Sequence, residues 1–311
     1  MKLFLLVLGV FAAASAAGPK FAPYFDLTLE NGPTLLDIAT KSNQKSFTLA
    51  FALGSHAGCV PMWGGMVPLD DPQIIAGIRE LQRQGGEFIV ATGGAMGPYL
   101  EHFCQTSDDL FNAYKTILDT VGTDHLDIDV EAPLNLDLVN KALARLQRER
   151  PATTLSYTLM IQGEDYGLTP ALGVEVLKSA KANGVRVDVV NAMTMEFGGT
   201  SPTWGETVVG AARSVLRQIK EEVWPEKSEA ELKKMLGITP MIGRNYNGRV
   251  LETSDARYVV QWANDNQIGY LGFWSSARDN GGCPGAVSPH CSGASQQSEF
   301  EFTRIFQGFR G

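Results

Sequence analysis

The sequence predicts an α/β fold in which eight parallel strands close into a (β/α)8 TIM barrel. Three observations support this prediction. Short apolar segments alternate with amphipathic segments along the whole chain, a pattern typical of a parallel sheet covered by helices. The alternation occurs eight times, which is the number of units that closes a barrel. The chain of 311 residues is also long enough for one large core of this kind.

Strands are expected at short apolar runs, and helices where apolar residues recur every three or four positions. The expected strands are 21–27, 46–53, 87–92, 125–131, 154–160, 187–193, 237–242 and 269–274. The expected helices are 33–41, 72–83, 108–120, 136–148, 170–182, 207–222 and 254–264, with a charged surface helix at 224–234.

Local signals support several of these boundaries. Asp71 before Pro72, and Ser254 before Asp255, are favourable helix starts, because Asp and Ser side chains accept hydrogen bonds from helix N–H groups. Gly184 follows an expected helix end, where glycine is common. An open, doubly wound sheet is the structural alternative, but no G-x-G-x-x-G motif follows the first strand.

The N-terminus has the pattern of a secretory signal peptide. Lys2 precedes an apolar run over 3–14, and small residues follow at 15–17. A membrane anchor is the weaker interpretation, because the run is too short to span a bilayer. We therefore expect residues 1–17 to be removed and residues 18–311 to form one secreted domain. The net charge of −8 makes nucleic acid or an anionic membrane a poor candidate partner, and we expect a monomer.

Four cysteines follow the predicted signal peptide: Cys59, Cys104, Cys283 and Cys291. An even number in a secreted chain suggests disulfides, and four cysteines permit three connectivities. We favour Cys59–Cys104 and Cys283–Cys291, because the second pair closes a short loop rich in glycine and proline. A zinc site is the competing interpretation, but the sequence has no C-x-x-C pair and no metal-like histidine spacing, so no metal ligand is assigned.

A row of acids ends the fourth expected strand. Because strand side chains alternate between faces, Asp127, Asp129 and Glu131 share one face, and the apolar residues between them share the other. Three like charges backed by an apolar face should raise at least one pKa. A carboxylic acid that stays protonated near neutral pH is suited to acid-assisted bond cleavage. The alternatives are a solvated acidic face and a calcium site, and the second lacks EF-hand spacing.

The spacing D-x-x-D-x-D-x-E over 124–131 resembles the signature of glycoside hydrolase family 18, the chitinases and their relatives. The resemblance extends to 21–26, to Gly93-Gly94 and to the segment 191–195. It is similar to the bacterial and fungal single-domain branch of that family. The resemblance implies a secreted hydrolase that acts on chitin or N-acetylglucosamine oligosaccharides and requires neither cofactor nor metal.

The family resemblance also implies a role for each acid. Glu131 would protonate the departing glycosidic oxygen. The substrate's own acetamido group would act as the nucleophile of a retaining reaction, as this family is an exception to the two-carboxylate rule. Asp129 would orient that group, and Asp127 would share a proton with Asp129.

Five further residues are expected to contact the sugar: Trp274, Met193, Tyr157, Glu196 and Asn245. The resemblance implies that Trp274 forms a floor under the sugar, although an indole on a barrel strand is alone more often part of the core. Met193 would line the site, and Glu196 would replace the aspartate found in many family members.

Met195 stands where many members of the family have a tyrosine that binds the acetamido oxygen. The missing donor would then come from Tyr157, Tyr246 or Asn245. Trp63 and Trp204 are expected in loops, where they could line outer sugar subsites or pack as lids.

Two other functions remain open from the sequence. One is a chitin-binding lectin on the same barrel, and the other is an endo-β-N-acetylglucosaminidase that acts on N-glycans. The presence of Glu131 favours an enzyme over the lectin, and a comparison of chitin oligomers with glycoproteins as substrates separates all three.

Overall fold

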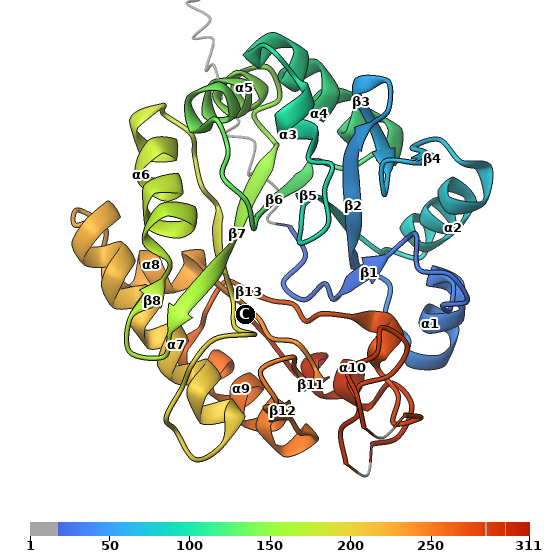
Figure 1. The fold of residues 1–311 in the computed structure, drawn as a ribbon, viewed down its shortest axis with the longest axis vertical. Coiled ribbons are helices and arrows are strands. Elements are labelled where there is room, and N and C mark those ends of the chain that lie inside the picture. Colours follow the sequence, from blue (N-terminus) through green and yellow to red (C-terminus); the bar gives the residue numbers. More distant parts are fainter. Residues whose placement is uncertain (1–17, 284, 296) are drawn as a thin grey trace, which may run out of the picture.

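The computed structural model describes residues 18–283, 285–295 and 297–311. Parallel strands form a barrel at the centre and helices surround it, so the predicted (β/α)8 fold is confirmed (Figure 1). The predicted signal peptide lies outside the described residues. The barrel strands are β1 (Tyr24–Asp26), β2 (Phe47–Ser55), β5 (Phe88–Gly93), β6 (His125–Val130), β7 (Thr154–Gly163), β9 (Val189–Met193), β10 (Leu236–Thr239) and β13 (Tyr270–Leu271).

The barrel closes between its first and last strands. From β13 the sheet runs through β10, β9, β7, β6 and β5 to β2, and β1 pairs with β2. Phe21 forms a parallel bridge to Leu271, and the N–H of Tyr24 donates to the carbonyl of Phe273 at 3.0 Å. Each of the eight predicted strands is therefore present in the barrel wall.

The main helices are α1 (Leu35–Ser42), α2 (Pro72–Arg83), α4 (Ser107–Val121), α5 (Leu136–Glu149), α6 (Glu175–Ala182), α7 (Trp204–Gln218), α8 (Glu229–Met235), α9 (Thr253–Asn266) and α10 (Glu301–Phe306). Asp71 caps α2 as predicted, accepting from two backbone N–H groups. The predicted cap at Ser254 is wrong, because α9 begins at Thr253 with Glu252 as its N-cap. Among the described residues no helix is long and apolar enough to cross a bilayer.

Several short elements were not predicted. A hairpin of β3 (Gly58–Trp63) and β4 (Val67–Pro68) extends β2, and α3 (Leu100–Phe103) follows β5. Others are β8 (Gly167–Leu168), β11 (Gly243–Arg244), β12 (Val250–Leu251) and the short helical turns Pro170–Val174, Ile219–Val223 and Ser276–Arg278. These elements contain too few residues to show a periodic pattern.

The placement of two tryptophans in loops is wrong. Trp63 lies on β3, fully buried, and its indole N–H donates to the carbonyl of Leu69 at 3.2 Å. Trp204 is the first residue of α7, and its buried ring packs 4.9 Å from the ring of Phe197. Both indole rings pack in the hydrophobic core, where such rings usually lie.

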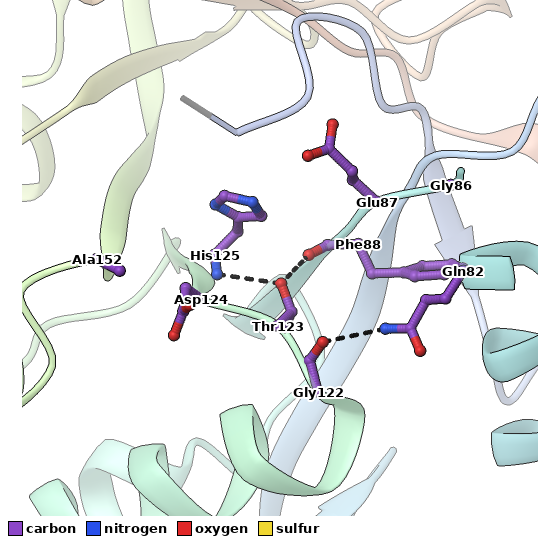
Figure 2. A pocket seen from close by; sticks show the side chains of 9 residues that line it. All are labelled: Gln82, Gly86, Glu87, Phe88, Gly122, Thr123, Asp124, His125 and Ala152. Carbon is purple, nitrogen blue, oxygen red and sulfur yellow. Dashed lines mark hydrogen bonds between the residues drawn. The ribbon is translucent and has the colours of Figure 1, made fainter. Parts of the chain in front are cut away.

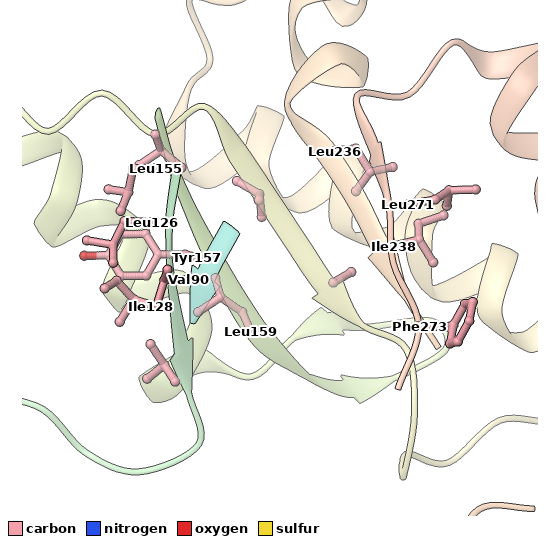
Figure 3. Packing of buried hydrophobic residues seen from close by; sticks show 14 of the residues in the cluster. Val90, Leu126, Ile128, Leu155, Tyr157, Leu159, Leu236, Ile238, Leu271 and Phe273 are labelled. Atoms are coloured by element: carbon pink, nitrogen blue, oxygen red, sulfur yellow. The ribbon is translucent and has the colours of Figure 1, made fainter. Parts of the chain in front are cut away.

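The two faces of the barrel wall differ in polarity. The outward face packs its apolar side chains against the helices (Figure 3), and burial of each such side chain contributes roughly 1.5–3 kcal/mol. These residues include Val90, Leu126, Ile128, Leu155, Tyr157, Leu159, Leu236, Ile238, Leu271 and Phe273. The inward face carries buried polar groups instead, among them Asp127, Thr158, Asn191 and Thr239. Asn191 accepts from Thr239 and donates to Thr158, each at 2.9 Å, so the interior is a connected hydrogen-bond network.

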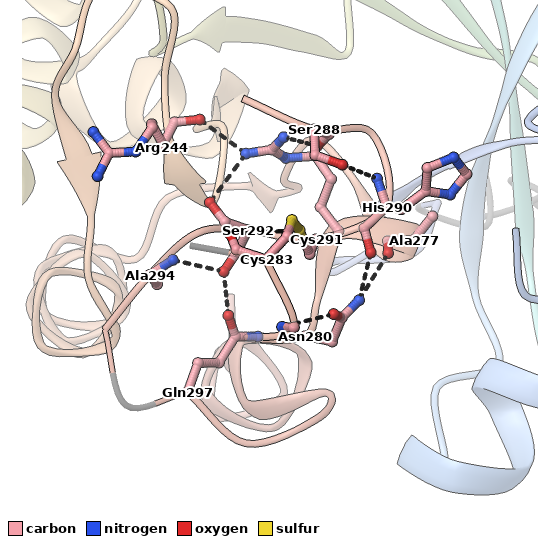
Figure 4. Close-up of a disulfide and its surroundings, with 12 residues drawn as sticks. Arg244, Ala277, Asn280, Cys283, Ser288, His290, Cys291, Ser292, Ala294 and Gln297 are labelled. Carbon is pink, nitrogen blue, oxygen red and sulfur yellow. Dashed lines mark hydrogen bonds between the residues drawn. A yellow bond between two sulfur atoms is a disulfide. The ribbon is translucent and has the colours of Figure 1, made fainter. Parts of the chain in front are cut away.

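The structure pairs the four cysteines as favoured from the sequence. Cys59 on β3 is joined to Cys104, the residue after α3, and their Cα atoms lie 4.7 Å apart. Cys283 and Cys291 close the loop after the last barrel strand, with Cα atoms 5.8 Å apart (Figure 4). The first bridge ties the unpredicted hairpin to the segment that follows β5.

Candidate active site

The three predicted acids come together at the carboxyl end of β6. Asp127 and Asp129 are buried on this strand, and Glu131 follows its last residue, Val130, and is half-buried. Strand alternation directs Asp127 and Asp129 into the barrel, because Ile128 and Val130 belong to the outward-facing core. Catalytic groups of (β/α)8 enzymes lie at this end of the barrel.

Asp127 accepts hydrogen bonds from three hydroxyl groups. Tyr24 donates at 2.8 Å, Thr158 at 2.9 Å and Ser156 at 2.5 Å. Burial raises the pKa of Asp127 to about 6, although all three hydrogen bonds oppose this rise by stabilising the carboxylate. Asp127 is therefore prepared to carry a negative charge inside the barrel.

Asp129 has very different surroundings. Its Oδ1 atom is buried and has no hydrogen-bond partner among the described residues. Burial raises the pKa of Asp129 well above its usual range, and the nearby charges of Glu131 and Asp127 raise it further. The three hydroxyl donors favour the charged form of Asp127, whereas no described residue donates to the buried Oδ1 of Asp129.

The backbone next to Asp129 requires glycine. Gly93 on β5 pairs with Asp129 at a φ of +85°, and any side chain there would collide with the Asp129 carbonyl oxygen. The same carbonyl accepts from the N–H of Gly94 at 3.0 Å. The first contact explains why residue 93 must be a glycine, and at Gly94, with a φ of +87°, a side chain would instead meet the ring of Phe51.

Glu131 is held from outside the strand by Tyr99, a residue that the sequence analysis missed. The Tyr99 hydroxyl accepts from the backbone N–H of Glu131 at 2.9 Å and donates to the carbonyl of Gly94 at 2.7 Å. Partial burial raises the pKa of the Glu131 carboxyl. A raised pKa suits a group that must donate a proton near neutral pH.

Two of the predicted sugar contacts, Trp274 and Met193, lie on the inner side of the barrel wall. Trp274 is half-buried, and its ring stacks 5.9 Å from that of Phe51 and lies 6.0 Å from that of Tyr24, which binds Asp127. Met193 ends β9 on the face that Asn191 directs into the barrel. An indole half-open to solvent next to the acids can offer its face to a sugar ring.

The prediction that Tyr157 contacts the substrate is wrong. Tyr157 pairs with Ile128 on β6, so its ring faces outward into the core between the barrel wall and the helices. Its hydroxyl donates to Asn140 on α5 at 2.6 Å, and the side chain is fully buried. The predicted strand is confirmed, but its register with β6 places Tyr157 on the outer face of the barrel wall.

Glu196 and Asn245 have structural partners instead of open sites. Glu196 is exposed, and its carboxylate accepts from the backbone N–H groups of Tyr246 at 2.8 Å and Asn247 at 2.9 Å. Asn245 is buried, and its amide donates to the carbonyls of Met241 and Gly243. Asn245 therefore cannot also donate to an acetamido oxygen, whereas Tyr246, which is 79% exposed, is free of this constraint.

A hollow of about 330 Å³ lies at the opposite end of the barrel, around the start of β6 (Figure 2). It is lined by Glu87, Asp124 and His125 among others, and Thr123 there accepts from the N–H of His125 and donates to the carbonyl of Phe88. This is the end where barrels carry stabilising features. In the described part of the chain, no group of three or more His, Cys, Asp or Glu side chains is arranged to hold a metal ion.

The fold and the row of acids are those of the (β/α)8 glycoside hydrolases. The catalytic domain of a thermostable chitinase from Pyrococcus furiosus, solved as catalytic-site mutants with chito-oligosaccharides, is 38% identical and superposes with a TM-score of 0.86. The similarity covers 93% of this chain and 94% of that domain. The chain therefore belongs to the chitinase-like members of glycoside hydrolase family 18.

Two curated relatives are similar over part of their length. The "Probable bifunctional chitinase/lysozyme" of Escherichia coli (strain K12) is 35% identical over 94% of this chain, and "Endochitinase 11" of Metarhizium anisopliae is 35% identical over 85%. The chain spans 35% of the first relative and 53% of the second. No family model matches the chain. A fungal endo-β-N-acetylglucosaminidase, 14% identical with a TM-score of 0.60, shares the fold.

Proposed function

We propose that the protein is a secreted chitinase that hydrolyses β-1,4 linkages between N-acetylglucosamine units. The observation that carries the proposal is the arrangement of the acids on β6: Asp127 accepts from three hydroxyl groups, a buried oxygen of Asp129 has no partner among the described residues, and Glu131 is half-buried at the strand end. The relatives that are named chitinases add support, because they cover most of this chain. We further propose that residues 18–311 form one catalytic domain that is secreted after removal of the signal peptide.

In the proposed mechanism, Glu131 transfers its proton to the glycosidic oxygen as the bond to the anomeric carbon breaks. The carbonyl oxygen of the substrate's acetamido group attacks that carbon and forms an oxazolinium ion. Asp129 binds the acetamido N–H, and its position next to Asp127 lets the pair stabilise the positive charge. Glu131, now ionised, takes a proton from water as the water attacks the same carbon, and the bond from this carbon to the acetamido oxygen breaks, which restores the acetamido group. The sugar is released with retained configuration.

The structure provides a reason to favour substrate assistance over a protein nucleophile. Glu196, a predicted sugar contact that follows β9, is a candidate nucleophile, but its carboxylate oxygens bind the backbone N–H groups of Tyr246 and Asn247. Retaining glycosidases that use a carboxylate nucleophile need it about 5–5.5 Å from the acid. A carboxylate that is occupied in fastening a loop is a poor candidate for this role.

The test compares fully N-acetylated with deacetylated oligomers of the same length, and determines the anomeric form of the first product by NMR. We expect cleavage of the acetylated oligomers with retained configuration and negligible cleavage of the deacetylated ones. Equal cleavage of both, or an inverted product, contradicts the mechanism. Release of glycans from a glycoprotein without cleavage of chitin oligomers contradicts the chitinase assignment. Binding of oligomers with no cleavage contradicts the assignment of an enzyme.

A further inference from the structure

We propose that α3 and its flanking residues, Tyr99 to Cys104, act as a clamp that positions Glu131, with Tyr99 as the positioning residue. The inference rests on the proposed function, in which Glu131 is the proton donor. It assigns a role to a short segment that lies outside the acid motif and that sequence periodicity does not reveal.

The first contact of the clamp is made by Tyr99, which joins the ends of two neighbouring barrel strands through one oxygen atom. Its hydroxyl accepts from the N–H of Glu131, after β6, and donates to the carbonyl of Gly94, after β5. The Tyr99 side chain is 3% exposed, so water cannot easily replace the hydroxyl. Removal of that oxygen would leave the partly buried N–H of Glu131 and the buried carbonyl of Gly94 without this partner.

The second contact comes from His102 on the same segment. Its ring stacks on Tyr99, with centroids 5.0 Å apart and planes inclined by 15°. Its Nε2 atom forms a hydrogen bond of 2.8 Å with the carbonyl of Pro133, two residues beyond Glu131. The segment therefore binds the backbone at Glu131 and again at Pro133. Two such contacts restrain both the position and the direction of the backbone at Glu131.

Three further contacts hold the clamp itself. Glu101 is buried and accepts from Thr92 of β5 at 2.6 Å and from Tyr114 of α4 at 2.8 Å. The ring of Phe103 packs against Gly54 of β2. The disulfide from Cys104 to Cys59 joins the end of the segment to β3.

These contacts matter because a general acid must lie within hydrogen-bond reach of the oxygen it protonates. Glu131 follows the last residue of β6, so the regular ladder of the sheet does not restrain its backbone. A displacement of about 1 Å can cost about 100-fold in rate. The clamp supplies the restraint that the strand lacks at this position.

The test is the variant Tyr99→Phe, which removes the bridging oxygen and keeps the ring. The matched control is Tyr157→Phe, which removes another buried tyrosine hydroxyl, one that faces the helices. We expect Tyr99→Phe to lower kcat by about 10- to 100-fold with KM almost unchanged, since binding does not depend on proton transfer. Tyr157→Phe should lose similar stability with kcat unchanged.

Two measurements make the outcome decisive. Hydrogen exchange of a peptide spanning Glu131 should accelerate in Tyr99→Phe and not in Tyr157→Phe. The double variant Cys59→Ser/Cys104→Ser should lower kcat in the same direction, and its combination with Tyr99→Phe should be less than multiplicative, because both act through one segment. An unchanged kcat in Tyr99→Phe, or equal losses in Tyr99→Phe and Tyr157→Phe, overturns the clamp while wild-type activity upholds the proposed function. A wild-type protein that cleaves no chitin oligomer overturns the proposed function, and the role of the clamp with it.

Discussion

Asp127 and Asp129 lie two residues apart on β6, and their hydrogen bonding is opposite. Asp127 accepts from three hydroxyl groups, whereas a buried oxygen of Asp129 has no partner among the described residues. These surroundings favour the charged form of Asp127 and disfavour that of Asp129. The two neighbouring carboxyl groups are therefore suited to different roles.

The first prediction concerns stability and pH in Asp129→Asn. Burial and neighbouring charges raise the pKa of Asp129 in the folded protein, so its ionisation costs stability. The cost is absent below the unfolded pKa of about 3.9 and grows as pH rises through the folded pKa. Asparagine never ionises, so the variant should gain stability relative to wild type as pH increases from about 4 to 8.

Urea unfolding at several pH values measures the free energy of unfolding of the variant and of wild type. The variant's gain should exceed about 1 kcal/mol near pH 8, since one pKa unit corresponds to about 1.4 kcal/mol. Asp70→Asn provides a control, because it makes the same change at an exposed acid outside the acid row. If Asp129→Asn gains the same free energy of unfolding at every pH, the raised pKa of Asp129 is contradicted.

The second prediction concerns Tyr24→Phe. Tyr24 donates to Asp127, so its removal should raise the pKa of Asp127 above about 6. A hydrogen bond to a charged group is worth roughly 1.5–3 kcal/mol, which corresponds to about one pH unit or more. If the ionised Asp127 is required, the acidic limb of the kcat/KM profile should move to higher pH by about this amount. If the acidic limb of the kcat/KM profile does not move, the ionisation of Asp127 is not the cause of that limb.

The third prediction concerns Trp274→Ala. If the half-buried indole stacks on the substrate, its loss should weaken binding of acetylated oligomers by about tenfold, in line with the roughly 0.5–1.5 kcal/mol of an aromatic contact. Trp204→Phe is the control, because that ring packs against Phe197 in the core. Titration calorimetry measures the affinity of each variant for the acetylated oligomers. Equal affinities in wild type and Trp274→Ala exclude the stacking role.

The fourth prediction concerns the disulfides. Both pairs are formed in the structure, so alkylation of the unfolded, unreduced protein should label no cysteine. Non-reducing peptide mapping should link Cys59 to Cys104 and Cys283 to Cys291. A peptide that joins Cys59 to either late cysteine contradicts the pairing.

The barrel and the acid row could be predicted because each rests on a strong local pattern. Eight apolar strands alternate with amphipathic helices, and period-two alternation alone places Asp127 and Asp129 on one face. The same alternation argues against Tyr157 as a sugar contact, since Tyr157 pairs with Ile128, which faces outward. The face of Tyr157 depends on the register between β6 and β7, which the sequence does not show.

The errors and omissions share a physical origin in tertiary contacts. Tyr99 bonds to Glu131 across 32 positions, and Glu196 bonds to the N–H of Tyr246 across 50. Neither contact leaves a periodic trace in the sequence. The sequence predicts a loop at Trp63, because the strands of the hairpin that contains it are too short to show a clear alternation.

The most direct test of the account measures Glu131→Gln. Glutamine keeps the size of the side chain and cannot donate a carboxylic proton, so the variant should bind N-acetylated chitin oligomers as wild type does. Its kcat on the same oligomers should fall by at least about 10²–10⁴-fold, the usual contribution of positioned proton transfer. Retained binding with this loss establishes Glu131 as the proton donor, and turnover within a few fold of wild type contradicts it.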